Sequence, residues 1–159
     1  MKNLFKSLFP CFFPKKSNTE SLPQYSAATA NAQNVINSIF FLERLNSYRE
    51  LLALKSLELC KNQKIYDMCY SHVLHMEKSG NANHDNQFER HDYINWLFCK
   101  QVDNRECVAK GYSSPQAYLN AFLNSPKHKD ALINPNMTHA CIVFSYDKKY
   151  LMVFLYELK

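Results

Sequence analysis

The chain has 159 residues and a formal net charge of +5, and 47% of its residues are hydrophobic, 14% aromatic and 21% charged. This length and aromatic content suit one domain that folds alone. The same composition excludes a disordered chain and a coiled coil. A polytopic membrane protein is excluded because the sequence has no run of about eighteen uncharged apolar residues. The charge argues against a nucleic-acid partner, because four lysines fall within the first sixteen residues and the remainder has 15 basic and 14 acidic residues, without a basic stripe.

Residues 1–16 form a basic, Phe-rich N-terminal segment. The run from Ser7 to Pro14 is too short to span a bilayer. Lys6 and Pro10 argue against a cleavable signal peptide. Two alternatives remain, a disordered tail and an interfacial anchor in which Phe side chains enter the headgroup layer, lysines attract anionic lipid and Cys11 is an S-acylation site. With the anchor, we expect a secreted or cell-surface, membrane-associated protein that contacts lipid through this segment.

A polar, Ala-rich stretch over residues 17–33 predicts a flexible linker, and the globular domain is expected over residues 34–159. Apolar spacing predicts a first helix over 34–54 and a second over 65–79 that ends at Gly80. Residues 81–105 look loop-rich. The later expected elements are a strand at 106–109, a helix from Ser114-Pro115 to 124, a helical turn over 126–133 and a hairpin of strands 141–146 and 150–158. This order predicts an α+β layer architecture.

Six histidines and six cysteines are the main candidates for chemistry. His72 and His75 share a face of the second helix and are either packing residues or ligands. His84, Glu106 and His128 stand at the ends of predicted elements, where a shallow metal or acid/base cleft would form if they converge. No CxxC pair is present, which argues against structural zinc on thiolates. A disulfide between Cys107 and Cys141, both in or next to predicted strands, remains open.

Four ordered segments resemble the CAP superfamily, which comprises cysteine-rich secretory proteins, antigen 5 and pathogenesis-related proteins and is also called the SCP family. Residues 69–84 are similar to its bacterial A-x2-H-A-x2-M-x3-G-x3-H run. Residues 104–109 resemble its GENIA segment, and residues 111–135 its SPxH-containing helix region. Residues 137–139 resemble its FTH strand entry. The resemblance covers the chain from about residue 34 to 158.

The resemblance implies an α/β/α sandwich with a central antiparallel sheet. It also implies that His84, Glu106 and His128 are cleft residues, with His139 as a further candidate. In many family members such a cleft binds a divalent cation, and imidazole with carboxylate suits Zn²⁺. This chain departs from the pattern, since a second cleft Glu and a further cleft His are missing. Arg105 beside Glu106 is expected to lower the pKa of Glu106 and to occupy its oxygens.

Three functions follow from these observations. The resemblance favours a non-enzymatic surface or membrane-associated module that binds a ligand or a protein partner and carries a degenerate His/Glu cleft. The alternative is a divalent-metal-dependent hydrolase, with His84, His128 and His139 as ligands and Glu106 as the general base. The third is a structural or oligomerising domain with an inert cleft. The lost cleft residues favour a protein that is not an enzyme.

Overall fold

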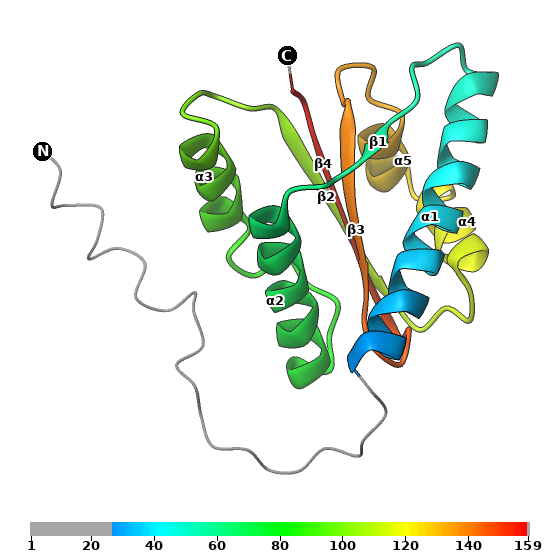
Figure 1. Ribbon diagram of the computed structural model, residues 1–159. Helices are drawn as coiled ribbons and strands as arrows, with labels where there is room; N and C mark the ends of the chain where they lie inside the picture. Colours follow the sequence, from blue (N-terminus) through cyan, green and yellow to red (C-terminus); the bar gives the residue numbers. More distant parts are fainter. Residues whose placement is uncertain (1–26, 159) are drawn as a thin grey trace, which may run out of the picture.

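The computed structural model describes residues 27–158, which fold into an α/β/α sandwich (Figure 1). The helices are α1 (Ala27–Leu51), α2 (Gln63–Ser79), α3 (Gln87–Leu97), α4 (Pro115–Leu123) and α5 (Pro126–Leu132). The strands are β1 (Glu58–Leu59), β2 (Asn104–Lys110), β3 (His139–Phe144) and β4 (Tyr150–Tyr156). The predicted α+β class and layered sandwich are therefore confirmed.

The sheet has the strand order β1-β3-β4-β2. Strand β4 pairs antiparallel with β3 on one side and with β2 on the other, so β2 is an edge strand. The short strand β1 pairs parallel with β3. The expected antiparallel sheet is thus correct for three strands and needs correction for the fourth, whose two residues carry no alternation that would have predicted it.

Two apolar cores cover the two faces of the sheet, with α1, α4 and α5 on one side and α2 and α3 on the other (Figure 1). Strand β4 supplies both: Leu151, Val153 and Leu155 face the first core, and Met152, Phe154 and Tyr156 the second. Because side chains alternate across a strand, a strand buried on both faces reads as one apolar run. The cores place β4 at the centre of the molecule.

Two polar side chains of α1 bind the outer edge of β3, beyond the end of β1. Ser38 Oγ donates to the Ile142 carbonyl at 2.8 Å, and Asn34 Nδ2 donates to the Phe144 carbonyl at 3.2 Å. Strand β1 contacts only the beginning of β3, so these carbonyls would otherwise lack a strand partner on that side. Helix α1 therefore serves as a cover for this edge of the sheet.

Most predicted elements are confirmed, but the start of α1 and the whole of α3 differ from the prediction. Gly80 ends α2 in the left-handed conformation at φ 73°, and Ser114 caps α4 by accepting from the Ala117 N–H, both as expected. Helix α1 begins at Ala27, inside the stretch predicted as a linker. Helix α3 lies in the stretch predicted as loop. Residues 1–16, the predicted anchor, lie outside the described residues.

Helix α3 escaped prediction because its inward face is not a continuous apolar stripe. Its buried residues are Arg90 and Ile94, which are one turn apart. A guanidinium at a core-facing position breaks the spacing by which an amphipathic helix is found in a sequence. The one available signal was Asn86 followed by Glu89, which is the spacing of a helix start.

The described cysteines are free thiols: Cys60, Cys69, Cys99, Cys107 and Cys141. The Cys107–Cys141 disulfide left open by the sequence is not formed. Cys107 belongs to the core under α1, α4 and α5, whereas Cys141 belongs to the opposite core. The sheet itself separates these two side chains.

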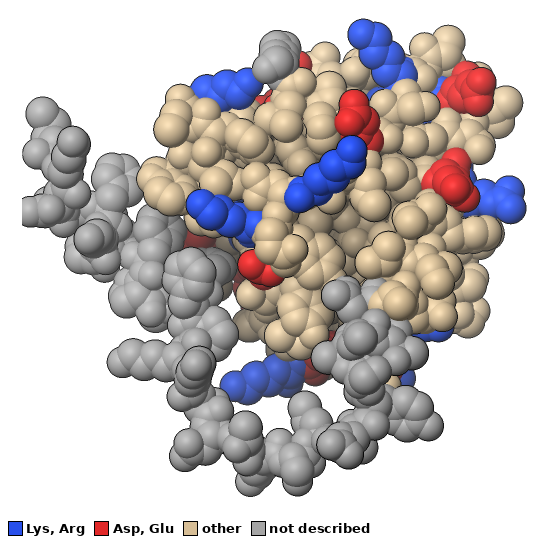
Figure 2. All heavy atoms as spheres, in the orientation of Figure 1, with Lys and Arg blue, Asp and Glu red and all other residues tan. Residues whose placement is uncertain are grey.

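The surface carries both signs of charge. On the face shown in Figure 2, Lys and Arg side chains are interspersed with Asp and Glu over a largely uncharged surface. Among the helices of residues 27–158, none is long and apolar enough to cross a membrane.

Candidate functional site

One of the predicted cleft residues, Glu106 on the edge strand β2, has a buried carboxylate. Its side chain is 0% exposed and faces α2 and α3. Arg90 on α3 binds both carboxylate oxygens: Nε donates to Oε2 and Nη2 to Oε1, each at 2.7 Å. This is a bidentate ion pair between two buried groups, the strongest geometry available to a guanidinium and a carboxylate.

Further hydrogen bonds extend this pair into a network that joins β2, α3, α2 and the segment after α2. His84 Nδ1 lies 2.7 Å from Glu106 Oε1. Arg90 Nη1 donates to the Asp85 carbonyl at 2.6 Å and to His72 Nδ1 at 3.1 Å. We call His72, His84, Arg90 and Glu106 the Arg90 network.

His72 uses both ring nitrogens inside the protein. Since Nδ1 accepts from Arg90, the proton is on Nε2, which donates to the Asn83 carbonyl at 2.8 Å. Burial, followed by the charge of Arg90, lowers the pKa of His72 and keeps the ring neutral. The packing interpretation of His72 is therefore correct. His75 is half-exposed and pairs with Asp85 at 3.1 Å.

The ionisation of Glu106 follows from its partners. Burial alone would raise its pKa, but the hydrogen bonds from His84 and Arg90 and the positive charge of Arg90 outweigh burial and hold the pKa at about 2. The sequence-based attribution to Arg105 is wrong, because Arg105 is exposed and pairs with Asp103 at 2.6 Å. Neighbouring positions on a strand face opposite sides of a sheet, so Arg105 cannot share the site of Glu106.

His128 lies on α5, on the opposite side of the sheet from the Arg90 network. Its ring packs against Phe122, with centroids 4.9 Å apart. Burial lowers the pKa of His128, and the charge of His84 lowers it further. The structure places His84 against Glu106 and His128 against Phe122, so the convergence of all three residues on one cleft stays a prediction.

His139 lies in a different place. It stands at the start of β3, and β4 separates β3 from the strand that carries Glu106. Its ring stacks on Tyr156 at 5.2 Å, and Tyr156 in turn stacks on Phe98 at 6.1 Å. Glu58 Oε2 is 4.0 Å from His139 Nε2. His139 is thus part of a second site and not a neighbour of Glu106.

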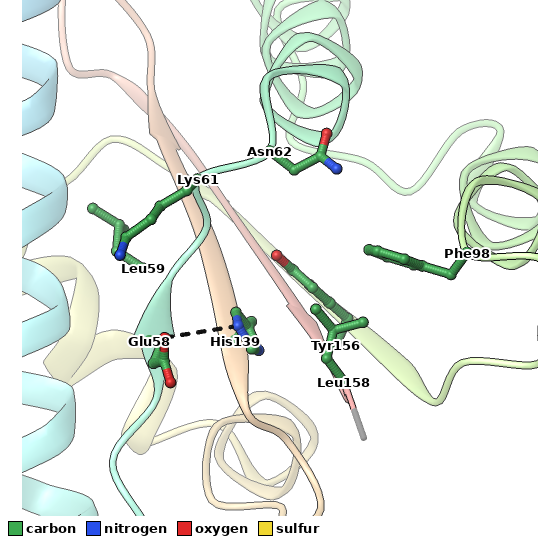
Figure 3. A pocket seen from close by; sticks show the side chains of 8 residues that line it. All are labelled: Glu58, Leu59, Lys61, Asn62, Phe98, His139, Tyr156 and Leu158. Carbon is green, nitrogen blue, oxygen red and sulfur yellow. Dashed lines mark ion pairs between the residues drawn. The ribbon is translucent and has the colours of Figure 1, made fainter.

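This second site is a pocket of about 200 Å³ between the β1–α2 segment, the end of β4 and the end of α3 (Figure 3). We call this pocket the β1 pocket. The stacked rings of His139, Tyr156 and Phe98 form its wall, and polar groups lie at its rim. The lining residues are Glu58, Leu59, Lys61, Asn62, Phe98, His139, Tyr156 and Leu158.

The residues of the predicted cleft do not fit a divalent cation. Both oxygens of Glu106 are bound by Arg90, and a guanidinium in contact with the carboxylate repels a second cation. His72 cannot bind a metal ion, because one ring nitrogen carries the proton that it donates to Asn83 and the other accepts a hydrogen bond from Arg90. Within residues 27–158, no three His, Cys, Asp or Glu side chains are placed to hold a metal ion. Arg90 and Glu106 instead form a buried ion pair that fixes α3 to the sheet.

Two parts of these sites were missed from the sequence. Arg90 was hidden in the stretch assigned to loop, and a single arginine carries no motif. The β1 pocket was missed because Phe98, Tyr156 and Leu158 look like ordinary core residues until the sheet places them beside Glu58. His139 was found as a candidate, but with the wrong neighbours.

Comparisons with known proteins agree with the fold. The profile of the cysteine-rich secretory protein family, CAP, matches residues 42–156. Similar structures include an extracellular protein containing a SCP domain from Bacillus anthracis (18% identity, TM-score 0.69) and a cysteine-rich secretory protein from Staphylococcus aureus (16%, 0.64). A third is an outer surface protein from Borrelia burgdorferi (23%, 0.59).

The coverage differs among these structures. The chain aligns over 88% of its own length with 45% of the Bacillus chain, and over 91% with 42% of the Staphylococcus chain, so it spans less than half of either. It aligns over 76% of its length with 91% of the Borrelia chain. No curated protein matches the chain by sequence. By the family profile, which spans most of its length, this chain belongs to the cysteine-rich secretory protein (CAP) family.

Proposed function

We propose that this CAP domain is a non-enzymatic module at a cell surface, associated with a membrane, that binds a ligand or a protein partner. The observation that carries the proposal is the bidentate contact of Arg90 with the buried Glu106. A general base must be reachable by water or substrate and must accept a proton near neutral pH. A carboxylate that is 0% exposed, paired and held at a pKa of about 2 meets neither requirement.

The surface location is supported by two independent points. The similar structures are described as extracellular or outer surface proteins. In addition, the N-terminal half of α1 exposes four large apolar side chains, those of Val35, Ile36, Ile39 and Phe40. This patch follows the basic, Phe-rich segment along the chain, so both would meet the same membrane surface.

The β1 pocket is the candidate for partner binding. A pocket of about 200 Å³ is smaller than the cavities that usually enclose a whole ligand. It suits one side chain or one small group of a larger partner, held beside Phe98 and Leu158, which are partly exposed. Such single buried anchors often dominate the affinity of an interface.

To test the metal-dependent alternative, the full chain is titrated with zinc at neutral pH and the heat of binding is measured by calorimetry. We expect no saturable binding at micromolar zinc, and the same result for His84→Ala and His128→Ala. Zinc would need the Glu106 carboxylate as a ligand beside the histidines, and Arg90 already binds both of its oxygens. Micromolar binding by the wild type that both substitutions abolish would establish a metal site and remove the non-enzymatic proposal.

Membrane association is tested by flotation of the full chain with vesicles that contain anionic lipid. We expect the wild type to float, and replacement of Lys2, Lys6, Lys15 and Lys16 by Glu to reduce the bound fraction at least about tenfold, since each lysine near the surface contributes about 1 kcal/mol. Exchange of Lys127 and Lys129 on α5 for Glu is the matched control and should leave flotation unchanged. Equal flotation of the N-terminal variant and the wild type would remove the membrane claim.

A further inference from the structure

Three cysteines from separate parts of the sequence meet beneath the β1 pocket. Cys60 directly follows β1, Cys69 is on α2 and Cys141 is on β3. Cys69 and Cys141 are buried members of the core under α2, and the half-buried Cys60 packs against the same core. We call these residues the thiol triad. They play no part in the Arg90 network.

The strand register places Cys60 beside Cys141. Strands β1 and β3 pair in parallel, with Glu58 opposite His139 and Leu59 opposite Ala140. The ladder continues by one bond, since the Cys60 N–H donates to the Ala140 carbonyl at 2.8 Å. The next pair in this register is Cys60 with Cys141. Neighbouring strands lie about 4.8 Å apart, which is within the Cα separation of about 4.4–6.8 Å that a disulfide requires.

The side chains of the triad also face one another. The interaction with Cys141 is the largest cause of the raised pKa of Cys60, ahead of burial. Cys141 interacts with Cys60, which favours its thiolate, but contact with Cys69 and burial outweigh this and raise the pKa of Cys141. The pKa of each of these two thiols therefore depends on a neighbouring cysteine, which requires that the sulfur atoms lie close together.

Access to the triad differs between its members. Cys69 and Cys141 are 0% and 1% exposed, whereas Cys60 is half-buried and lies between Leu59 and Lys61, which line the β1 pocket (Figure 3). An oxidant in solution therefore reaches Cys60 first. The chain leaves the β1–β3 ladder after Cys60, so the residues that follow it can adjust to a new bond.

We propose that Cys60 and Cys141 form a disulfide when the chain meets an oxidising environment, which fixes the β1–α2 segment and one wall of the β1 pocket. With a low-molecular-weight disulfide as oxidant, Cys60 loses its proton and attacks one of the oxidant's sulfurs, and the small thiolate that leaves takes up this proton. Because the pKa of Cys60 is raised, only a small fraction is thiolate at neutral pH, and the step becomes faster as the pH rises. The Cys141 thiolate then attacks the Cys60 sulfur and releases the second small thiol. The protein loses two hydrogens, and the small disulfide is reduced to two thiols. The disulfide forms whether or not the β1 pocket binds a partner.

The test is to incubate the full, reduced chain with oxidised glutathione, block the remaining thiols with an alkylating agent and map the linked peptides by mass spectrometry. We expect one intramolecular bond that joins the peptides of Cys60 and Cys141, with Cys11, Cys69, Cys99 and Cys107 alkylated after unfolding. The bond should raise the midpoint of thermal unfolding by an amount of the order of 10 °C, because it closes a long loop. A reductant should reverse both changes.

Cys60→Ser is the decisive variant, because this half-buried position tolerates a hydroxyl. It should lose the linked peptide and the thermal shift. Cys107→Ala is the matched control: it also removes a sheet cysteine, one that is fully buried on the opposite face, and should keep both. A linkage of Cys60 to Cys69, a stable glutathione adduct on Cys60, or no bond at all would each overturn the proposal.

Discussion

Replacement of Arg90 by methionine should lower the free energy of unfolding by about 3–5 kcal/mol. Methionine preserves most of the apolar volume of the arginine stem, but it leaves the Glu106 carboxylate buried without a cation. It also removes the donors to the Asp85 carbonyl and to His72. Urea denaturation at neutral pH, followed by circular dichroism, measures the loss.

Two further variants identify the cause. Arg105→Met removes a neighbouring arginine whose exposed ion pair with Asp103 should contribute less than about 1 kcal/mol. The double variant Arg90→Met with Glu106→Leu should recover most of the lost stability, because it buries neither charge alone. If Arg90→Met and Arg105→Met lose the same amount, the Arg90 network does not hold the fold together.

Acid should destabilise the protein in two stages, one from buried histidines and one from Glu106. The folded-state pKa of Glu106 is about 2, below its usual value of 4.5. A depressed carboxyl pKa means that the unfolded chain binds the proton more readily, so the stabilisation is complete above about pH 4.5 and is lost as the pH falls toward 2. The shift corresponds to about 3 kcal/mol. Urea midpoints measured across this range give the profile.

Buried histidines cause the earlier stage. The pKa values of His72, of His128 and of His91, a half-buried residue of α3, are lowered chiefly by burial from the usual 6.5, so each is kept neutral in the fold. Their contribution is lost as the pH falls through about 6.5, in the same direction as that of Glu106. The variant Glu106→Gln has no titratable group at this position, so its stability profile should retain only the histidine stage. A wild-type profile with no further loss below pH 4.5 would contradict the assignment.

The sequence predicted most of the fold because most elements have local signals. Gly80 and the Ser114-Pro115 pair mark helix boundaries through backbone conformation and capping, which depend on near neighbours alone. The hairpin of β3 and β4 follows from two apolar runs around a polar turn. Helix α3 and strand β1 lack such signals, since one is fixed by an ion pair and the other by a distant strand.

The structure places two of the predicted cleft residues, His84 and Glu106, in contact, but the role of Glu106 was not predicted. His84, Glu106 and His128 could be found by resemblance, because their motifs lie in short segments. What Glu106 does depends on Arg90, which is 16 residues away and reaches it only after α3 packs against the sheet. Spacing along the chain contains no information on that contact, so a metal-binding carboxylate and a structural carboxylate look the same in the sequence.

The contacts of Ser38 and Asn34 with β3 bear on how this protein meets other proteins. An exposed strand edge is a template for added strands, from a peptide partner or from a second copy that begins to aggregate. Here the carbonyls of Ile142 and Phe144 are already bound by α1. A partner therefore cannot extend the sheet at this part of β3. A change that loosens the first half of α1 would uncover this edge and make the folded protein prone to self-association.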